Sequence, residues 1–150
     1  MSAVVTFSVN EMLCGLPVDA VREVLPMVAL RPLPQQTPPL VGLLTLRGEL
    51  IPVIALRAWL GWADRRPTVL TRILVVDGAS EGRIALVVDE VHDVVSTEGW
   101  RPSPVPPERL GGPIGYLSQL LQRDGVTIAL LDLTRLVALS QATIAATPER

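Results

Sequence analysis

The sequence predicts a mainly β protein built from small barrels, and two observations carry this prediction. Short apolar segments recur along the 150 residues, each bounded by Gly, Pro, Asp, Asn or Ser. Several of these segments are continuous aliphatic runs, which are typical of strands that are covered on both faces or that wrap into small barrels. The expected strands are Val4–Val9, Met12–Leu16, Glu49–Leu56, Arg72–Val76, Arg83–Val88, Val91–Val95, Gly115–Leu121 and Val126–Leu131.

Turn and helix signals lie between these strands. Asp124-Gly125 predicts a tight hairpin turn, and the glycine-containing stretch 77–82 predicts a longer hairpin loop. Four short helices are expected, and in the first of them Val18, Val21 and Leu25 would share one face. The expected helices are Pro17–Leu25, Pro39–Leu46, Leu56–Trp62 and Leu133–Ser140.

The polar stretch 63–67 divides the chain into two nearly equal halves, each with four or five strand candidates. Two small β subdomains within one domain of residues 1–150 follow from this division. We expect subdomain 1 at 1–66 and subdomain 2 at 67–139, with exchange of a strand or helix between them, and a C-terminal tail at 140–150. Two proline-rich stretches, 31–39 and 101–113, are expected as extended surface connections.

Composition excludes several classes of function. All 13 basic residues are arginines, so the chain has no lysine for a P-loop, a Schiff base or a kinase-type ATP site. The arginines are scattered and aromatic residues make up only 3%, which argues against nucleic acid as a partner. No apolar run approaches the roughly 18 residues of a membrane span, so we expect a cytoplasmic protein without direct membrane insertion.

Cysteine and histidine occur once each, as Cys14 and His92, so they cannot form a zinc site by themselves. Cys14 lies in an apolar context and is expected to be a small buried hydrophobe; a nucleophilic Cys14–His92 pair is the less favoured alternative. The acidic residues Asp89, Glu90 and Asp93 are interpreted as a solvated turn rather than a site for a hard cation. No cofactor and no metal are expected.

The order of motifs in both halves resembles the CheW-like adaptor domain. The first half carries Pro17-Val18-Asp19-Ala20-Val21-Arg22-Glu23-Val24, then Leu33-Pro34, then the stretch 39–57 with Leu46-Arg47-Gly48-Glu49 at its centre. The second half continues with 71–76, 85–91 and 130–133. The similarity covers residues 5–139, and the ordered set is specific although no single element is.

This resemblance implies a fold of two intertwined SH3-like five-stranded β-barrels with a few short helices, and no catalysis. The implied function is that of an adaptor coupling chemoreceptors to a CheA-type histidine kinase in a chemosensory array that serves flagellar or other motility. The implied partners are the regulatory domain of that kinase and the cytoplasmic tip of a methyl-accepting chemoreceptor, with recruitment to membrane-associated arrays. The alternative is a CheW-like scaffold for a non-receptor partner, such as a localisation protein or a ring-capping competitor.

Glu23 and Arg47 match the family positions for which receptor coupling is implied. The planar guanidinium of Arg47 can bind a partner's carboxylate or backbone carbonyl, and it can equally form an internal ion pair with Glu23. The two roles are compatible, because one arginine has donors for both. Four further residues complete the expected partner-binding set: Val21, Leu25, Thr45 and Gly48.

Some positions carry open alternatives. Gly42 and Gly48 are expected to be backbone requirements, for close approach to a helix and for a turn with positive φ. The tryptophans 59, 62 and 100 are expected either in the core or in an interface. Thr45 stands where the family usually has asparagine, and Leu117-Ser118-Gln119 replaces a glycine-containing strand start, which bears on the receptor that is engaged. Exposed sheet edges also allow weak self-association.

Overall fold

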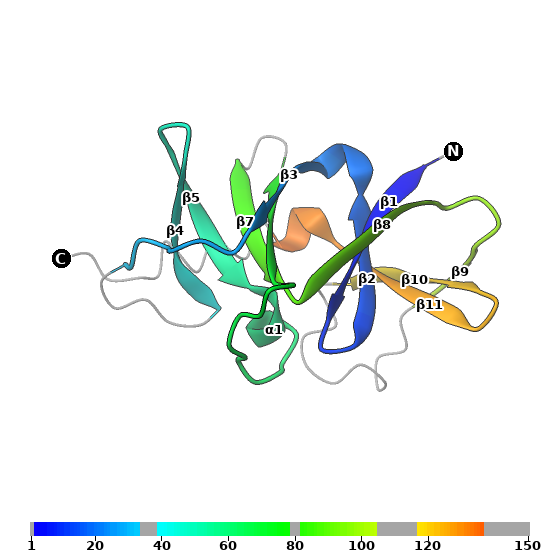
Figure 1. The fold of residues 1–150 in the computed structure, drawn as a ribbon. Coiled ribbons are helices and arrows are strands. Elements are labelled where there is room, and N and C mark those ends of the chain that lie inside the picture. The colour runs from blue at the N-terminus through cyan, green and yellow to red at the C-terminus, as the bar shows by residue number, and fades with distance from the viewer. Residues whose placement is uncertain (1, 34–38, 79–81, 105–116, 137–150) are drawn as a thin grey trace.

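The computed structural model describes residues 2–33, 39–78, 82–104 and 117–136. Two strand-rich units lie side by side, and the few helices are short (Figure 1). In chain order the elements are β1 (Ala3–Val9), β2 (Met12–Pro17), the 3-10 helix η1 (Val18–Ala20), β3 (Val21–Pro26), β4 (Leu40–Leu46), β5 (Glu49–Ala55), α1 (Leu56–Trp59), β6 (Arg72–Asp77), β7 (Arg83–Val88), β8 (Glu90–Ser96), β9 (Arg101–Ser103), β10 (Leu117–Arg123) and β11 (Val126–Leu131).

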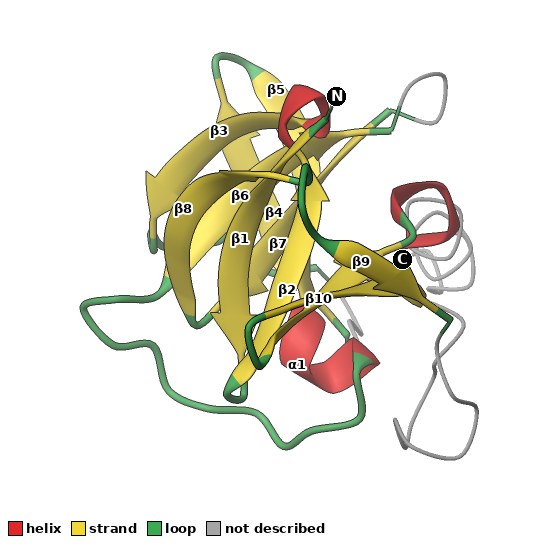
Figure 2. Cartoon of the chain, turned by 90° about the vertical axis from the view of Figure 1, so that its right-hand side faces the viewer, coloured by secondary structure: helices red, strands yellow, loops and turns green. Residues whose placement is uncertain are grey.

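The strands form two sheets. The six-stranded sheet has the order β8-β1-β2-β11-β10-β9, and the five-stranded sheet has the order β3-β6-β7-β5-β4. Each sheet is antiparallel except for one parallel pair, β2 with β11 and β5 with β7. Strands β7 and β8 follow one another directly and lead from one sheet into the other, and the strongly curved strands of the six-stranded sheet are visible in Figure 2. Each sheet therefore combines strands from before and after the stretch 63–67.

The five-stranded sheet closes on itself through the segment that follows β3. The backbone of Arg31 exchanges two hydrogen bonds of 2.8 Å with Leu43 of β4, the strand at the opposite edge. Gly42 makes this approach sterically feasible, because a Cβ built on it would lie 2.9 Å from the carbonyl oxygen of Arg31. The predicted close approach at Gly42 is thus present, although its neighbour is extended chain rather than a helix. The predicted fold class, mainly β with two small barrel-like sheets, is confirmed.

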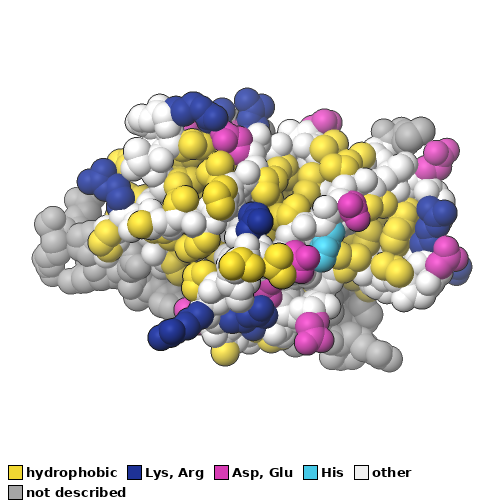
Figure 3. Space-filling model, in the orientation of Figure 1, with side chains coloured by type: hydrophobic (Ala, Val, Ile, Leu, Met, Phe, Trp, Pro, Cys, Tyr) yellow, Lys and Arg dark blue, Asp and Glu magenta, His cyan; other side chains and the backbone are white. Residues whose placement is uncertain are grey.

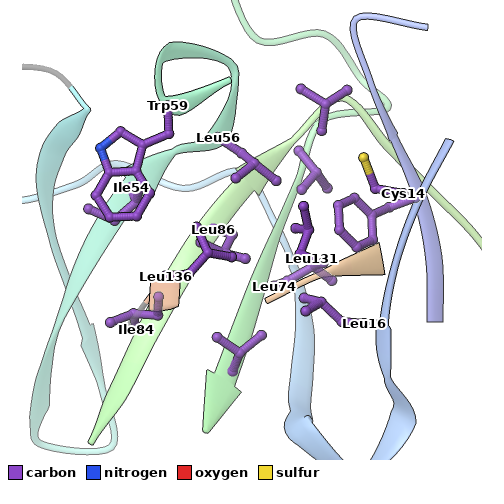
Figure 4. Packing of buried hydrophobic residues seen from close by; sticks show 14 of the residues in the cluster. Cys14, Leu16, Ile54, Leu56, Trp59, Leu74, Ile84, Leu86, Leu131 and Leu136 are labelled. Carbon is purple, nitrogen blue, oxygen red and sulfur yellow. The ribbon is translucent and has the colours of Figure 1, made fainter. Parts of the chain in front are cut away.

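Two clusters of buried side chains share the strands of the five-stranded sheet, because β6 and β7 are covered on both faces. In β6, Leu74 and Val76 point into a large cluster with β1 and β2, whereas Ile73 and Val75 point into a smaller cluster within the barrel. Figure 4 shows the large cluster from close by, with Cys14 and Leu16 of β2 facing Leu74. The continuous aliphatic runs of the sequence are explained by this double coverage.

Two helix predictions were wrong. Residues 21–26 and 40–46 are strands, and only Val18–Ala20 is helical within the first predicted segment. The exposure of β3 alternates from residue to residue, as in a strand. The register shifts at a β-bulge between Val21 and Glu23, and Val21 packs against the large cluster whereas Leu25 packs against the smaller one, so the expected shared face of Val21 and Leu25 is not present. Tertiary pairing overrides the weak local helix signal here, since β3 pairs with β6 and β4 pairs with β5.

Other predicted elements are present within the described residues. Each expected strand is found with small shifts of its ends, and α1 corresponds to the short helix expected from Leu56. Asp124 and Gly125 form the tight turn between β10 and β11, with φ angles of 49° and 81°. Residues 133–136 are helical, as expected for the start of the last helix. The remainder of that helix, the tail at 140–150, most of both proline-rich stretches and the start of the strand expected at 115 lie outside the described residues.

Candidate functional site

Arg47 and Gly48 form the tip of the hairpin that joins β4 to β5. Leu46 pairs with Glu49 across a two-residue turn, in which both Arg47 and Gly48 have positive φ angles, 49° and 83°. Such turns match the twist of the flanking strands and favour glycine, which confirms the turn predicted for Gly48. The hairpin projects at the upper left of Figure 1, so the long side chain of Arg47 starts from a prominent position.

Arg47 forms an ion pair with Glu23 of β3, through a hydrogen bond from Nη1 to Oε2. The Arg47 side chain remains 72% exposed, whereas that of Glu23 is 26% exposed. The hydrogen bond from Arg47 lowers the pKa of the Glu23 carboxyl below its usual value, and the same bond raises the pKa of the Arg47 guanidinium. The internal pair therefore exists, and Arg47 still presents most of its surface to solvent.

The ion pair stands at the edge of an open depression of about 200 Å³. Its walls are Val21, Arg22, Glu23, Leu46, Arg47, Val75 and Arg83. Two further ion pairs lie on the same end of the sheet: Arg83 bonds Glu49 at 3.0 Å, and Arg22 lies 3.9 Å from Asp77. Basic and acidic side chains consequently lie close together over this end of the five-stranded sheet (Figure 3). The depression is suited to a polar, hydrogen-bonding protein surface rather than to an apolar ligand.

The other predicted partner-binding residues differ in how close they lie to this ion pair and to the depression. Val21 lines the depression and also packs against the large core cluster. Leu25 packs against the smaller cluster and is not part of the depression's wall. Thr45 is exposed on β4, opposite Leu50 of β5, and Gly48 is exposed at the hairpin tip. A role of these residues in partner binding stays a prediction.

Arg22 and Arg83 were missed by the sequence reasoning, although both belong to the wall of the depression. Arg22 had no strand signal in the sequence, because the apolar residues Val21, Val24 and Leu25 have the spacing of a helix. Arg83 had no signal of its own, because its position beside Glu23 depends on the order of strands β3, β6 and β7.

The alternative nucleophile is not supported. Cys14 is fully buried, and burial raises the pKa of its thiol to about 12, with a smaller contribution from the charge of Asp89. Reactive cysteines are partly exposed and have a lowered pKa, so Cys14 is a core residue. His92 lies on β8 with Nε2 3.0 Å from the hydroxyl of Ser8 and is not hydrogen-bonded to Cys14.

The prediction of a solvated acidic turn was wrong for Asp89. Its side chain is 17% exposed and accepts a 2.7 Å hydrogen bond from Nη1 of Arg57. Glu90 and Asp93 belong to β8 rather than to a turn. Within the described ranges, no group of three or more His, Cys, Asp or Glu side chains could hold a metal ion.

The tryptophans divide between core and periphery. Trp59 of α1 is 5% exposed and belongs to the large core cluster, and Trp62 packs against that cluster. Trp100 is partly buried, and its ring N–H has no hydrogen-bond acceptor within the described part of the chain. Trp59 is therefore a core residue, which is one of the two expected positions, core or interface.

The structure thus consists of two curled sheets with an exposed, ion-paired hairpin tip and a buried cysteine. The chain belongs to the CheW-like domain family, whose model matches residues 3–141. It is 25% identical over 129 residues to the chemotaxis protein CheW of Rhizobium meliloti (strain 1021), covering 86% of this chain and 83% of that protein.

A solved structure supports the same family. The crystal structure of the scaffolding protein TtCheW from Thermoanaerobacter tengcongensis superposes with a TM-score of 0.77 at 28% identity, over 87% of this chain and 88% of that chain. The resemblance stated from the sequence is confirmed. Across the residues that the structure describes, no helix is long and apolar enough to cross a membrane.

Proposed function

We propose that this protein is a non-catalytic adaptor that couples chemoreceptors to a CheA-type histidine kinase in a chemosensory array. Family membership and the chemotaxis and scaffolding relatives support the class of function. The partners are the regulatory domain of the kinase and the cytoplasmic tip of a methyl-accepting receptor. The adaptor acts in the cytoplasm, recruited to membrane-associated arrays.

The observation that carries the residue-level proposal is the geometry of Arg47. Glu23 occupies one part of its guanidinium and thereby orients it, while the side chain stays 72% exposed above the depression. A guanidinium has five N–H donors in a fixed planar arrangement, so the remaining donors are available to a partner's carboxylate or carbonyl oxygen. Glu23 is then a positioning residue, and Arg47 is the residue that contacts the partner.

The experiment is titration calorimetry of the purified protein with the regulatory domain of the kinase from the same organism, and separately with the receptor tip. We expect Arg47→Glu to fold normally and to lose at least tenfold in affinity for one of the two. Arg135→Glu, another exposed arginine outside the depression, is the matched control and should bind like wild type. Absence of binding by folded wild-type protein to either probe would contradict the adaptor function.

A charge swap separates the two roles of the pair. If Arg47 acts only as an internal partner of Glu23, the double variant Glu23→Arg with Arg47→Glu restores both stability and binding. If Arg47 also contacts the partner, the swap restores the melting temperature but leaves binding weak. We expect the second result. Full restoration of binding would remove Arg47 from the interface and leave it a structural role.

A scaffold for a non-receptor partner, such as a localisation protein or a ring-capping competitor, remains the alternative. Its signature in the same titrations is binding to the kinase domain without binding to the receptor tip.

A further inference from the structure

Arg83 of β7 lines the Arg47 depression without taking part in the ion pair between Arg47 and Glu23. Its Nη1 donates a 3.0 Å hydrogen bond to Oε1 of Glu49, the first residue of β5. The side chains of Arg83 and Glu49 are 33% and 50% exposed. Ion pairs this exposed contribute little to stability, so the pair is of interest for its effect on neighbouring charges.

Charged side chains continue the inward-facing rows of the five-stranded sheet at this end. The inward-facing residues pack in the smaller core cluster, and they include Leu25, Ile51, Val75 and Ala85. Successive residues on one face of a strand are two positions apart. Two positions from each of these residues, at the end of the sheet where Arg47 lies, the chain places Glu23, Glu49, Asp77 and Arg83. A charged rim therefore borders the apolar interior of this sheet.

The β4–β5 hairpin brings Arg47 between two of these carboxylates. Arg47 follows β4, whereas Glu23 lies on β3, and these two strands are the opposite edges of the sheet. The ion pair of Arg47 with Glu23 therefore joins the two edges. Glu49 follows Arg47 by two residues, on the other side of the same tight turn. Arg47 thus has one carboxylate across the sheet opening and a second one on its own hairpin.

The pairing of these charges is selective. Among the described residues, Arg47 bonds Glu23 and Arg83 bonds Glu49. A Glu49 carboxylate without Arg83 would be free to accept a hydrogen bond from Arg47, because the two side chains start from either side of Gly48. Such a bond would draw the guanidinium away from Glu23 and occupy donors that otherwise face solvent. Arg83 prevents this competition by engaging Glu49.

Arg83 also acts on Glu23 through its charge. The hydrogen bond from Arg47 is the main cause of the lowered pKa of the Glu23 carboxyl, and the positive charge of Arg83 adds a smaller lowering. Arg83 therefore favours the ionised form of the carboxylate that Arg47 binds. Both effects of Arg83 support the same arrangement, with Arg47 on Glu23 and not on Glu49.

We infer that Arg83 is a positioning residue for the Arg47 site: by engaging Glu49 it leaves Arg47 bonded to Glu23 and open to a partner. The inference rests on the proposed function, because it concerns how Arg47 is prepared for the contact proposed above. The partner concerned is the receptor tip, since the resemblance implies receptor coupling for Glu23 and Arg47. Arg83 acts only through Glu49 and Glu23, so neutralising Glu49 should make Arg83 dispensable.

A double-mutant cycle tests this dependence by calorimetric titration of the full chain with the receptor tip. Arg83→Gln should weaken the affinity about three- to fivefold, the size of one exposed ion pair. Glu49→Gln removes the competing charge and should bind like wild type, and so should the double variant with both substitutions. Arg123→Gln breaks an exposed ion pair with Asp124 in the other sheet, and as the matched charge control it should leave the affinity unchanged.

The titration of Glu23 gives a second readout that needs no partner. Carbon-13 NMR of the glutamate carboxyl groups, assigned with Glu23→Gln, follows its pKa in each variant of the cycle. Arg83→Gln should raise this pKa towards its ordinary value, because Arg47 is then shared with Glu49. The double variant should bring it back down by more than Glu49→Gln lowers it in the wild-type background. This non-additivity distinguishes competition for Arg47 from the loss of a distant charge.

The outcomes separate this inference from the proposed function. If wild-type protein does not bind the receptor tip, the proposed function fails, while the Glu23 titration still tests the role of Arg83. If wild-type protein binds and Arg83→Gln binds equally well, Arg83 is not a positioning residue. If the double variant binds as weakly as Arg83→Gln, Arg83 contacts the partner itself and the positioning role is overturned. Additive changes in the pKa of Glu23 would overturn it as well. Melting temperatures confirm that each variant is folded.

Discussion

Nη1 of Arg57, on α1, donates a 2.7 Å hydrogen bond to Oδ2 of Asp89, at the junction of β7 and β8. Nη2 of the same guanidinium donates to the side-chain oxygen of Asn10 at 2.9 Å, and the backbone N–H of Asn10 donates to Asp89 at 2.7 Å. Asn10 belongs to the turn between β1 and β2, so the network joins the two sheets. The side chains of Arg57 and Asp89 are only 14% and 17% exposed, so little water screens the pair.

Removing one member of this network should lower stability clearly. Asp89→Ala leaves the guanidinium of Arg57 and the N–H of Asn10 without their acceptor, at a cost of about 2–3 kcal/mol in the free energy of unfolding. The control is Asp77→Ala, which removes the exposed ion pair with Arg22 and should cost less than about 1 kcal/mol. Urea unfolding monitored by tryptophan fluorescence measures both. Equal effects of the two substitutions would show that the network adds no special stability.

Gly42 and Gly48 should respond differently to alanine. Gly42→Ala places a Cβ 2.9 Å from the Arg31 carbonyl oxygen, at a φ of 149°, and should destabilise by more than about 2 kcal/mol because the closing backbone contact must shift. Gly48→Ala meets no atom within 4 Å and carries only the strain of its positive φ, about 1 kcal/mol. Thermal unfolding of the two variants gives the comparison. A larger loss for Gly48→Ala would contradict the barrel closure through Arg31.

Stability should depend on pH through Glu23. The native state lowers the pKa of this carboxyl, so the native protein binds the proton more weakly than the unfolded chain. The stabilising contribution is therefore present above the unfolded pKa, about 4.3, and is lost as pH falls through the lower native value. The difference in urea midpoint between wild type and Glu23→Gln should shrink from pH 7 to pH 3. If the difference in urea midpoint between wild type and Glu23→Gln is the same at pH 7 and pH 3, the ion pair is contradicted. The variant Arg47→Gln removes the other partner of the pair, and its difference from wild type should shrink with falling pH in the same way.

Cys14 should be inert to thiol reagents in the native protein. Its raised pKa, about 12, leaves the thiol neutral at pH 8, and its side chain is fully buried. Ellman's reagent at pH 8 should therefore label the cysteine only after unfolding in urea. Rapid stoichiometric labelling of the native protein would show that the Cys14 thiol is accessible and reactive, which contradicts its burial. The same burial makes the folded state less stable above pH 9, where the unfolded thiol ionises and the native one does not.

Much of the strand content could be predicted from the sequence, because strands such as β6 and β7 are covered on both faces and so carry aliphatic runs, residues 73–76 and 84–88. The turn at Asp124-Gly125 was predictable for a local reason, since few residues tolerate two successive positive φ angles. β3 and β4 were not assigned correctly. Their sequences allow one or two helical turns, and the hydrogen-bond partners that select the extended form lie far along the chain.

The candidate site, like the fold, could be predicted only in part. Glu23 and Arg47 were named from the family pattern, and their ion pair was one of two uses considered. Asp89 was misjudged, because its surroundings in sequence are acidic whereas its partner Arg57 lies 32 residues away. The exposure of Val69 and Leu70 was not foreseen. Val69 and Leu70 resemble the start of the following strand, and only the turn closed by Thr68 and Thr71 places them in solvent.

The fold class, the family and the absence of lysine-dependent chemistry could be inferred without coordinates, because they follow from composition, periodicity and the order of short motifs. Which charges are paired and which surfaces are open depends on how the chain folds in three dimensions. The pairs Arg47–Glu23 and Arg57–Asp89 each join segments more than twenty residues apart, at 24 and 32 positions. Such pairs arise when strands from distant parts of the chain adopt one order and register, and that arrangement is set by the packing of the whole core rather than by any local stretch of residues.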